Sequence, residues 1–205
     1  MKTVLFQGDS VTAAGRNEKN DDDLGVGYAK IIAEEINSRT PGEYMFVNRG
    51  MNGDTSACIY ARMGTDILNI KPDYMTLLVG FNDISHFLTN NDGIASHRYE
   101  QLLCMLIEDV TQKLPSIKII MLEPFALEGK ITSAIWKDLE VGVKHNAAIA
   151  KAVADKYGLK FVPLQEKLNN LCKTKPADYW LADGIHPTAE GHKFLANEIM
   201  QALQL

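Results

Sequence analysis

The sequence predicts an α/β protein in which a parallel sheet of five strands lies between layers of helices. Five short runs of apolar and β-forming residues recur along the chain, and each is closed by glycine, proline or polar residues. Longer segments with apolar residues at helical spacing separate these runs. A regular alternation of strand and helix is typical of parallel strands joined by right-handed crossovers.

The expected strands begin with the run Thr3-Val4-Leu5-Phe6, which leads directly into Gly8-Asp9-Ser10. An unbroken apolar run, rather than an alternating one, is typical of a strand that is buried on both faces of a parallel sheet. We therefore expect this first strand to be central. The other four strands are expected at residues 44–47, 74–79, 117–122 and 160–163.

Helices are expected where apolar residues return every three or four positions. In the first of them Tyr28, Ile31, Ile32 and Ile36 share one face, and Pro41-Gly42 breaks the pattern. The expected helices cover about 27–38, 54–71, 98–114, 132–157, 165–172 and 188–202, with a polar loop before the third. No internal repeat or linker interrupts the pattern, so we expect one domain over residues 1–205.

Composition and charge exclude several classes of protein. The net charge is −5 and no basic run occurs, which argues against a nucleic-acid partner. No apolar run is long enough to insert into a membrane, and Gly8-Asp9 interrupts the N-terminal run before it could act as a signal peptide. A cytoplasmic location is therefore expected for the chain as given. The three cysteines form no CxxC pair, and no set of side chains has metal-ligand spacing, so no metal is expected.

Four positions carry the residue types that ester cleavage requires: Ser10, Gly53, Asn82 and the pair Asp183/His186. Three of them follow expected strands directly, so the ligand-binding edge of the sheet could gather them. A serine hydroxyl is a poor nucleophile until a base removes its proton, and histidine is the usual base. A carboxylate fixes the imidazole tautomer and stabilises the imidazolium.

The same set also offers donors for an oxyanion. Gly53 can present a backbone N–H without a side chain in the way, and Asn82 can present its amide. Asp183 precedes His186 by three residues, a spacing that one tight turn can hold. Taken alone, Gly-Asp-Ser is more often ordinary turn chemistry. The catalytic interpretation therefore depends on the whole set.

At these residues the sequence resembles the SGNH hydrolases, also called the GDSL esterase/lipase family. The family blocks are matched, in the family's order, by Gly8-Asp9-Ser10, residues 48–53 (Asn-Arg-Gly-Met-Asn-Gly), Gly80-Phe81-Asn82-Asp83 and residues 183–187 (Asp-Gly-Ile-His-Pro). Each block alone is a weak signal, but the ordered set is specific. The leucine of the family name is replaced by Val11, an apolar residue for an apolar residue.

The resemblance implies a three-layer α/β/α fold with a flavodoxin-like sheet and a serine ester hydrolase that needs no cofactor. It implies Ser10 as nucleophile, His186 as base and Asp183 as the group that orients it. It further implies an oxyanion hole from the N–H groups of Ser10 and Gly53 and the side chain of Asn82.

The flanking segments are similar to the branch of the family that contains acetyl-xylooligosaccharide and related carbohydrate acetylesterases: residues 8–12 through Gly15-Arg16, Tyr60-Ala61-Arg62, Glu123-Pro124-Phe125 and Trp180. This similarity implies short-chain acetyl esters of carbohydrates as substrates. The alternatives are a thioesterase or lysophospholipase acting on longer acyl chains, or a non-catalytic ligand-binding module on the same scaffold. Assembly into a homo-oligomer is left open.

Four large side chains adjoin the family blocks and are candidates for the substrate pocket: Met51, Phe81, Phe125 and Trp180. Trp180 could stack on a sugar face. Packing in the core or at the rim explains the same four residues equally well.

Overall fold

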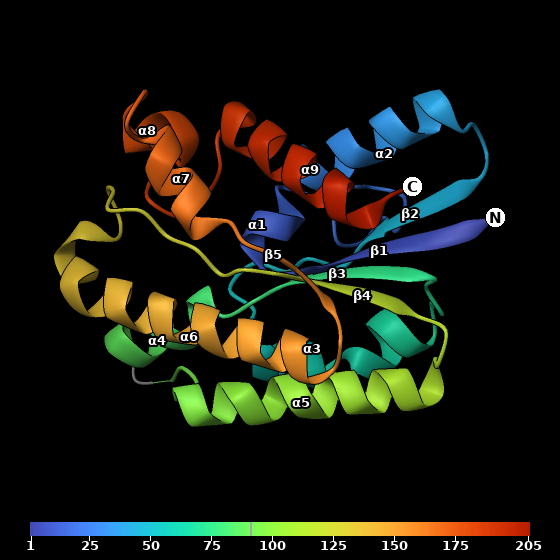
Figure 1. Ribbon diagram of the computed structural model, residues 1–205, viewed down its shortest axis with the longest axis horizontal. Helices are drawn as coiled ribbons and strands as arrows, with labels where there is room; N and C mark the ends of the chain where they lie inside the picture. The colour runs from blue at the N-terminus through green and yellow to red at the C-terminus, as the bar shows by residue number, and fades with distance from the viewer. Residues whose placement is uncertain (91) are drawn as a thin grey trace.

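The computed structural model describes residues 1–90 and 92–205, and a sheet of five parallel strands forms its centre (Figure 1). The strand order is β2-β1-β3-β4-β5, the order of flavodoxin-like sheets. The strands are β1 (Lys2–Gly8), β2 (Tyr44–Asn48), β3 (Tyr74–Leu78), β4 (Lys118–Leu122) and β5 (Lys160–Val162). The predicted fold class is confirmed, and all five strands lie within about two residues of the predicted ranges.

The central place of β1 follows from its unbroken apolar run. Val4 and Phe6 point into the hydrophobic cluster on one face of the sheet, and Leu5 points into the cluster on the other. All three side chains are fully buried. β1 pairs with β2 on one side and with β3 on the other, so its backbone is also enclosed.

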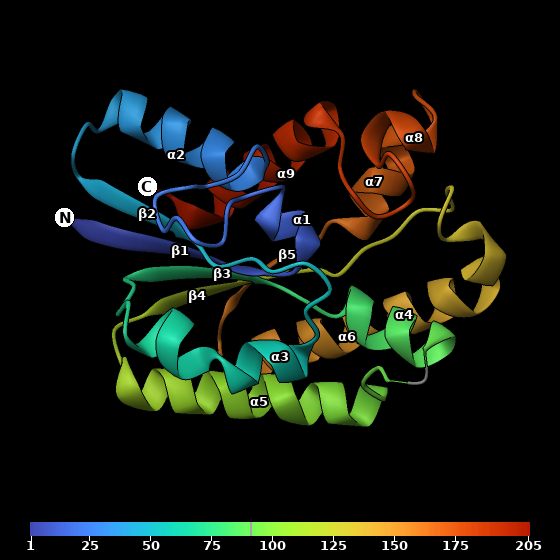
Figure 2. The ribbon, with the colours of Figure 1, turned by 180° about the vertical axis from the view of Figure 1, so that it is seen from behind.

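Helices cover both faces of the sheet, as the two opposite views show (Figures 1 and 2). Helices α2 and α9, with the short α7 and α8, lie on one face, and α3, α5 and α6 lie on the other. Their bounds are α1 Ser10–Ala13, α2 Tyr28–Arg39, α3 Ser56–Ala61, α4 Phe81–Thr89, α5 Ser96–Lys113, α6 Trp136–Lys156, α7 Gln165–Leu171, α8 Ala177–Trp180 and α9 Ala189–Leu203. No helix in the described part of the chain combines the length and apolar character needed to cross a bilayer.

Two expectations about helices were wrong. The polar loop expected between the third strand and the third long helix contains α4; position 91 in that loop lies outside the described residues. Helix α4 packs on α6 through its buried Ile84, and Gly142 allows this close approach, because a Cβ there would lie 2.2 Å from the Ile84 side chain. The single helix expected over 54–71 is instead α3 followed by a π-helical turn at Gly64–Leu68.

The sheet order creates a crevice at the carboxyl ends of β1 and β3. The chain leaves β1 toward β2 on one side and returns to β3 on the other, and ligands in open α/β sheets bind at such a switch point. Ser10 directly follows β1, and the segment that begins α4 directly follows β3. The sequence blocks singled out above therefore meet at one edge.

Packing of α5 against the sheet gives a test of this core. Leu103 is fully buried, whereas Met105 of the same helix is 43% exposed. We expect Leu103→Ala to lower the free energy of unfolding by about 2–5 kcal/mol, because it removes buried contacts and leaves a cavity. Met105→Ala, the matched control, should change it by less than about 1 kcal/mol. Urea unfolding followed by circular dichroism measures both, and equal losses would contradict the described packing.

Candidate active site

The structure brings Ser10, His186 and Asp183 into one hydrogen-bonded line. Ser10 Oγ lies 2.9 Å from His186 Nε2, and His186 Nδ1 lies 2.7 Å from Asp183 Oδ2. Ser10 opens α1 at the end of β1, where Asp9 caps the helix by accepting a hydrogen bond from the Val11 N–H. Residues 176 positions apart in the sequence thus come within hydrogen-bonding distance.

A tight turn holds Asp183 and His186 in this geometry. Oδ1 of Asp183 accepts hydrogen bonds from the N–H groups of Ile185 and His186, at 3.0 and 2.9 Å. Burial alone would raise the pKa of the Asp183 carboxyl, but the hydrogen bonds from His186 and the backbone outweigh it, so this pKa is lowered. The carboxyl is therefore a carboxylate at neutral pH.

The segment after β4 braces this turn from outside. Leu127 N–H donates to the Gly184 carbonyl, and Ile131 N–H donates to the Asp183 carbonyl. Gly184 has φ +104°, and a Cβ there would lie 2.5 Å from Thr132 Oγ1. Glycine is therefore required at this position, both for the backbone conformation and for the close approach.

The three expected oxyanion donors border the same cleft. Ser10, Gly53 and Asn82 all line it, and the N–H groups of Ser10 and Gly53 donate to no residue that the structure describes. The Asn82 amide donates to the Asp54 carbonyl at 3.0 Å and lies 3.4 Å from Asp9 Oδ2. These contacts fix the plane of the amide beside Ser10.

Arg62 connects the loops behind these donors, and sequence reasoning had not assigned it a role. Its guanidinium donates to the Asp54 carboxylate, to Gln7 Oε1 and to the Arg49 carbonyl. Its ion pair with Asp54 measures 2.6 Å. Arg62 therefore ties the end of β1 to the loop that carries Gly53. Its sequence signal was its place in Tyr60-Ala61-Arg62, one of the segments similar to the carbohydrate acetylesterase branch.

The cleft at Ser10 has a volume of about 880 Å³. Of the four large side chains proposed for substrate contact, Phe81 lines it, whereas Met51, Phe125 and Trp180 lie outside its lining. Phe125 is only 3% exposed and belongs to the core, and Trp180 packs edge-on against Tyr179. Two residues that sequence reasoning missed, the exposed Val26 and Ile131, line the cleft as well.

His192 also lines this cleft, and its sequence context gave no sign of it. The sequence predicts only a structural or exposed histidine at this position. The residue is buried, and its Nδ1 accepts a hydrogen bond from the Tyr28 N–H at 3.2 Å. Its place in the first turns of α9, six residues after His186, is the one signal that could have suggested it.

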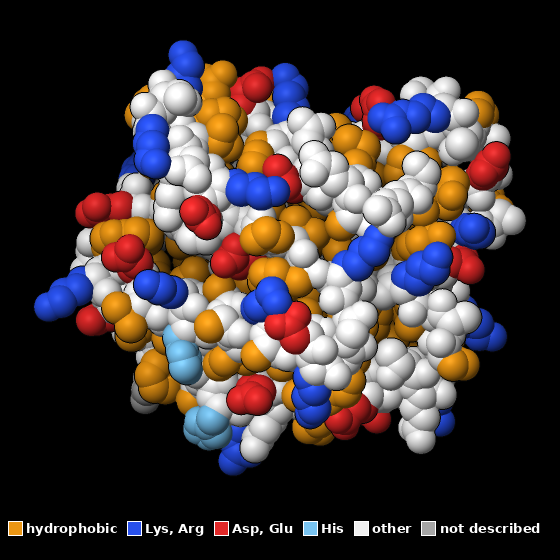
Figure 3. Space-filling view, in the orientation of Figure 1, with side chains coloured by type: hydrophobic (Ala, Val, Ile, Leu, Met, Phe, Trp, Pro, Cys, Tyr) orange, Lys and Arg blue, Asp and Glu red, His pale blue; other side chains and the backbone are white. Residues whose placement is uncertain are grey.

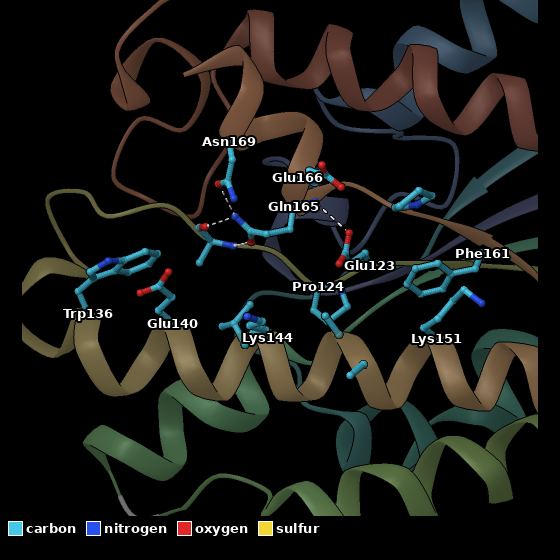
Figure 4. A pocket seen from close by; sticks show the side chains of 15 residues that line it. Glu123, Pro124, Trp136, Glu140, Lys144, Lys151, Phe161, Gln165, Glu166 and Asn169 are labelled. Carbon is cyan, nitrogen blue, oxygen red and sulfur yellow. Dashed lines mark hydrogen bonds between the residues drawn. The ribbon is translucent and has the colours of Figure 1, made fainter. Parts of the chain in front are cut away.

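A second cavity of about 710 Å³ lies between α6 and the segments that follow β4 and β5 (Figure 4). Trp136 lies toward one end of it and Phe161 toward the other, and Glu140 and Lys144 rise from α6 between them. The same face of the molecule shows hydrophobic side chains interspersed with charged ones (Figure 3). This cavity shares no lining residue with the cleft at Ser10. Among the described residues, no group of three or more His, Cys, Asp or Glu could hold a metal ion.

Asp9 is the carboxyl most perturbed by its surroundings near Ser10. Burial raises its pKa to about 7, although the Val11 N–H and His186 act in the opposite direction. The unfolded chain, with the ordinary pKa of 3.8, releases the Asp9 proton near pH 4. The folded protein keeps this proton up to about pH 7. Asp9 thus makes the folded state less stable as the pH rises through this range.

The matching experiment compares the wild type with Asp9→Asn, which keeps an oxygen for the Val11 N–H. We expect the free energy of unfolding of the wild type to fall relative to that of the variant by on the order of 1–3 kcal/mol between pH 4.5 and pH 7.5. Urea unfolding at several pH values measures the difference. A difference that stays constant with pH would show that Asp9 keeps an ordinary pKa.

Comparisons with known proteins agree with this geometry. The model of the GDSL-like Lipase/Acylhydrolase family matches residues 6–194. The acetylxylan esterase of Geobacillus stearothermophilus is 27% identical, over 98% of this chain and 93% of that protein. The Escherichia coli protein thioesterase 1/protease 1/lysophospholipase L1 is 25% identical, over 98% of this chain and 83% of that protein.

Solved structures give the same result for the fold. A protein from Parabacteroides merdae, assigned as a GDSL-like lipase, has a TM-score of 0.92 at 29% identity and covers 99% of this chain and 95% of its own. The Geobacillus acetylxylan esterase has a TM-score of 0.87 at 25% identity, over 100% of this chain and 94% of its own. Since the family model spans nearly the whole sequence, the chain belongs to the GDSL-like lipase/acylhydrolase (SGNH hydrolase) family and is a carboxylic ester hydrolase.

Proposed function

We propose that this enzyme removes acetyl groups from carbohydrates by means of a Ser10–His186–Asp183 triad. The observation that carries the proposal is the line of contacts from Ser10 Oγ through the imidazole to the carboxylate, at 2.9 and 2.7 Å. Both distances are those of good hydrogen bonds, so a proton can pass from the hydroxyl to the imidazole without rearrangement.

In the proposed reaction, Ser10 Oγ attacks the ester carbonyl while His186 Nε2 takes its proton. Asp183 holds the proton on Nδ1, which keeps Nε2 free to accept, and its negative charge stabilises the imidazolium that forms. His186 then gives the proton to the leaving alcohol. A water molecule, activated by the same imidazole, hydrolyses the acetyl-enzyme and restores Ser10.

The negative charge that develops on the carbonyl oxygen would be held by the N–H groups of Ser10 and Gly53 and by the Asn82 amide. The two free N–H groups support this role. Both hydrogens of the Asn82 amide face acceptors, the Asp54 carbonyl and Asp9 Oδ2. The longer contact, at 3.4 Å to Asp9, is the weaker one, so the hydrogen that makes it is the one that would bind the oxyanion.

The acetylxylan esterase supports both the triad and the substrate class. Its solved structures include catalytic mutants in which a serine, an aspartate or a histidine is replaced by alanine. In that esterase the aspartate and the histidine are three positions apart, as Asp183 and His186 are here. Its tryptophan one position before the aspartate has no counterpart at the same spacing, because Ala182 precedes Asp183 and Trp180 lies outside the cleft. Trp180 therefore has no part in the proposed contact with the sugar.

Hydrolysis of longer acyl chains is the second candidate function. Val26 and Ile131 line the cleft with 77% and 50% of their surfaces exposed, and they offer apolar contact to a chain that extends past Ser10. The Escherichia coli thioesterase and lysophospholipase is a relative over nearly the full chain. The two candidates differ in the acyl length that they favour.

The triad is tested by Ser10→Ala. We expect turnover of p-nitrophenyl acetate to fall by at least about 10³-fold, since in the described part of the chain the His186 ring has a hydrogen bond with no other hydroxyl than that of Ser10. Ser133→Ala, at an exposed position, is the matched control and should keep wild-type turnover. Stopped-flow or steady-state absorbance at the nitrophenolate band measures both, with circular dichroism as the check on folding. Near-wild-type turnover by the Ser10 variant would refute the proposed nucleophile.

The substrate class is tested by a series of p-nitrophenyl esters from acetate to octanoate, together with acetate release from acetylated xylo-oligosaccharides. We expect kcat/KM to be highest for the acetate and to fall by about tenfold or more by octanoate, with acetate released from the sugars. A maximum at octanoate would favour the long-chain candidate instead. Absence of acetate release together with a preference for p-nitrophenyl acetate would leave a short-chain esterase that does not act on sugars.

A further inference from the structure

The cleft contains one more imidazole, that of His192, to which the proposed reaction gives no task. The residue lines the cleft together with Ser10 and His186. Only 7% of its surface is exposed. His192 lies six residues after His186, in the first turn of α9, whose start is fixed because Thr188 Oγ1 accepts a hydrogen bond from the Gly191 N–H.

The backbone of α2 fixes the tautomer of this ring. The Tyr28 N–H donates to Nδ1 at 3.2 Å, so Nδ1 must carry a lone pair and the proton of the neutral ring must be on Nε2. Gly27 allows this close approach, because a Cβ there would lie 2.6 Å from Cε1 and 2.9 Å from Nδ1 of His192. Tyr28 is itself anchored, since its hydroxyl is 2.8 Å from Thr12 Oγ1 in α1.

The Nε2–H of His192 is left free for a ligand. The Nδ1 side of the ring faces the backbone at residues 27–28, so the side with Nε2 is the one that can reach the cleft. Nε2 has no hydrogen-bond partner among the described residues, and it is not one of the enclosed polar atoms that lack a partner. Burial, together with the nearby His186, lowers the pKa of His192 to about 4, so the ring is neutral at neutral pH.

The proposed reaction indicates which part of the substrate this donor would meet. The leaving alcohol must lie beside His186, because that imidazole returns the proton to it, whereas the carbonyl oxygen lies toward Gly53 and Asn82. His192 lines the cleft together with His186, Pro187 and Ala189, and it lies near enough to His186 to be affected by its charge. A hydroxyl or ring oxygen on the alcohol half would accept a hydrogen bond there.

We propose that His192 is a substrate-positioning residue, a neutral imidazole of fixed tautomer whose Nε2–H binds an oxygen on the alcohol half of the ester. This inference rests on the proposed direction of the ester in the cleft, but it does not require that the alcohol be a sugar. The His192 donor would favour esters of polyhydroxy alcohols over esters of the same acid with an aryl alcohol, because only the former offer a further hydroxyl on the alcohol half. His192 thus contributes to specificity for the alcohol, in addition to any selection by acyl length.

Two substitutions at His192 test the roles of Nδ1 and Nε2 separately. In His192→Asn the side-chain oxygen can take the place of Nδ1 and accept from Tyr28, but nothing replaces Nε2. In His192→Gln the amide nitrogen can take the place of Nε2 and donate into the cleft, but the acceptor for Tyr28 is lost. The exposed His145 of α6 provides the control His145→Asn, which should behave as wild type.

The measurement is kcat/KM on two acetyl esters, glycerol monoacetate and p-nitrophenyl acetate. For His192→Asn we expect the ratio of the first to the second to fall by about tenfold, mainly through KM, which corresponds to the loss of one hydrogen bond. His192→Gln should recover most of this ratio. An equal loss on both esters, or a ratio as low in the Gln variant as in the Asn variant, would overturn the proposal. Failure on acetylated xylo-oligosaccharides alone would count against the sugar substrate and not against His192.

A measurement on the wild type keeps the inference testable if the variants do not fold. Nitrogen-15 NMR of the histidine side chains reports the tautomer and titration of each ring. We expect one histidine, identified by its loss in whichever variant folds or by its contact with the Tyr28 amide proton, to be protonated at Nε2 only, without titration between pH 8 and pH 5.5. Protonation at Nδ1, or titration near neutral pH, would overturn the proposal.

Discussion

A four-residue turn, from Asp183 to His186, must hold an imidazole above the end of β1, and much of the surrounding structure depends on this requirement. The turn is stabilised from within, because Asp183 Oδ1 accepts hydrogen bonds from the N–H groups of Ile185 and His186. It is closed behind by the hydrogen bond from the Ala182 N–H to the His186 carbonyl and by the bridge between Leu181 and Pro187. The segment after β4 then packs on it from outside through Leu127 and Ile131. The imidazole is therefore oriented by the backbone of two separate segments.

Buried acidic groups surround the other half of the cleft. Asp9 and Asp83 are enclosed, and burial raises their pKa values to about 7 and about 6. Each accepts hydrogen bonds from the backbone, Asp9 from Val11 and Asp83 from Ser56. The negative charge of a third carboxylate, that of Asp54, is balanced by its ion pair with Arg62. These groups hold the loops that carry Gly53 and Asn82 in register with β1, so they shape the cleft without lining it.

The sequence was sufficient to predict the sheet, and to predict that Ser10, Asp183 and His186 meet at one site, because both leave local patterns. Apolar runs closed by glycine mark β1 and β3, and Ser10 and Asn82 follow those runs directly. The supporting contacts leave no such pattern. Helix α4 follows Gly80 directly, and its close packing on α6 depends on the absence of a side chain at Gly142, which is distant in sequence. His192 and Arg62 resemble ordinary helical residues, and their roles arise from partners about 160 and 50 positions away, Tyr28 and Gln7.

The long separation between Ser10 and His186 also determines when the site can exist. Contacts between residues so far apart form only after large loops have closed, which makes them late events in folding. Synthesis runs from the N-terminus, so the serine leaves the ribosome long before the histidine has been added. A nascent or truncated chain that ends before His186 carries the hydroxyl of Ser10 without the imidazole, so the proposed triad can form only after nearly the whole chain has been made and its two ends have met.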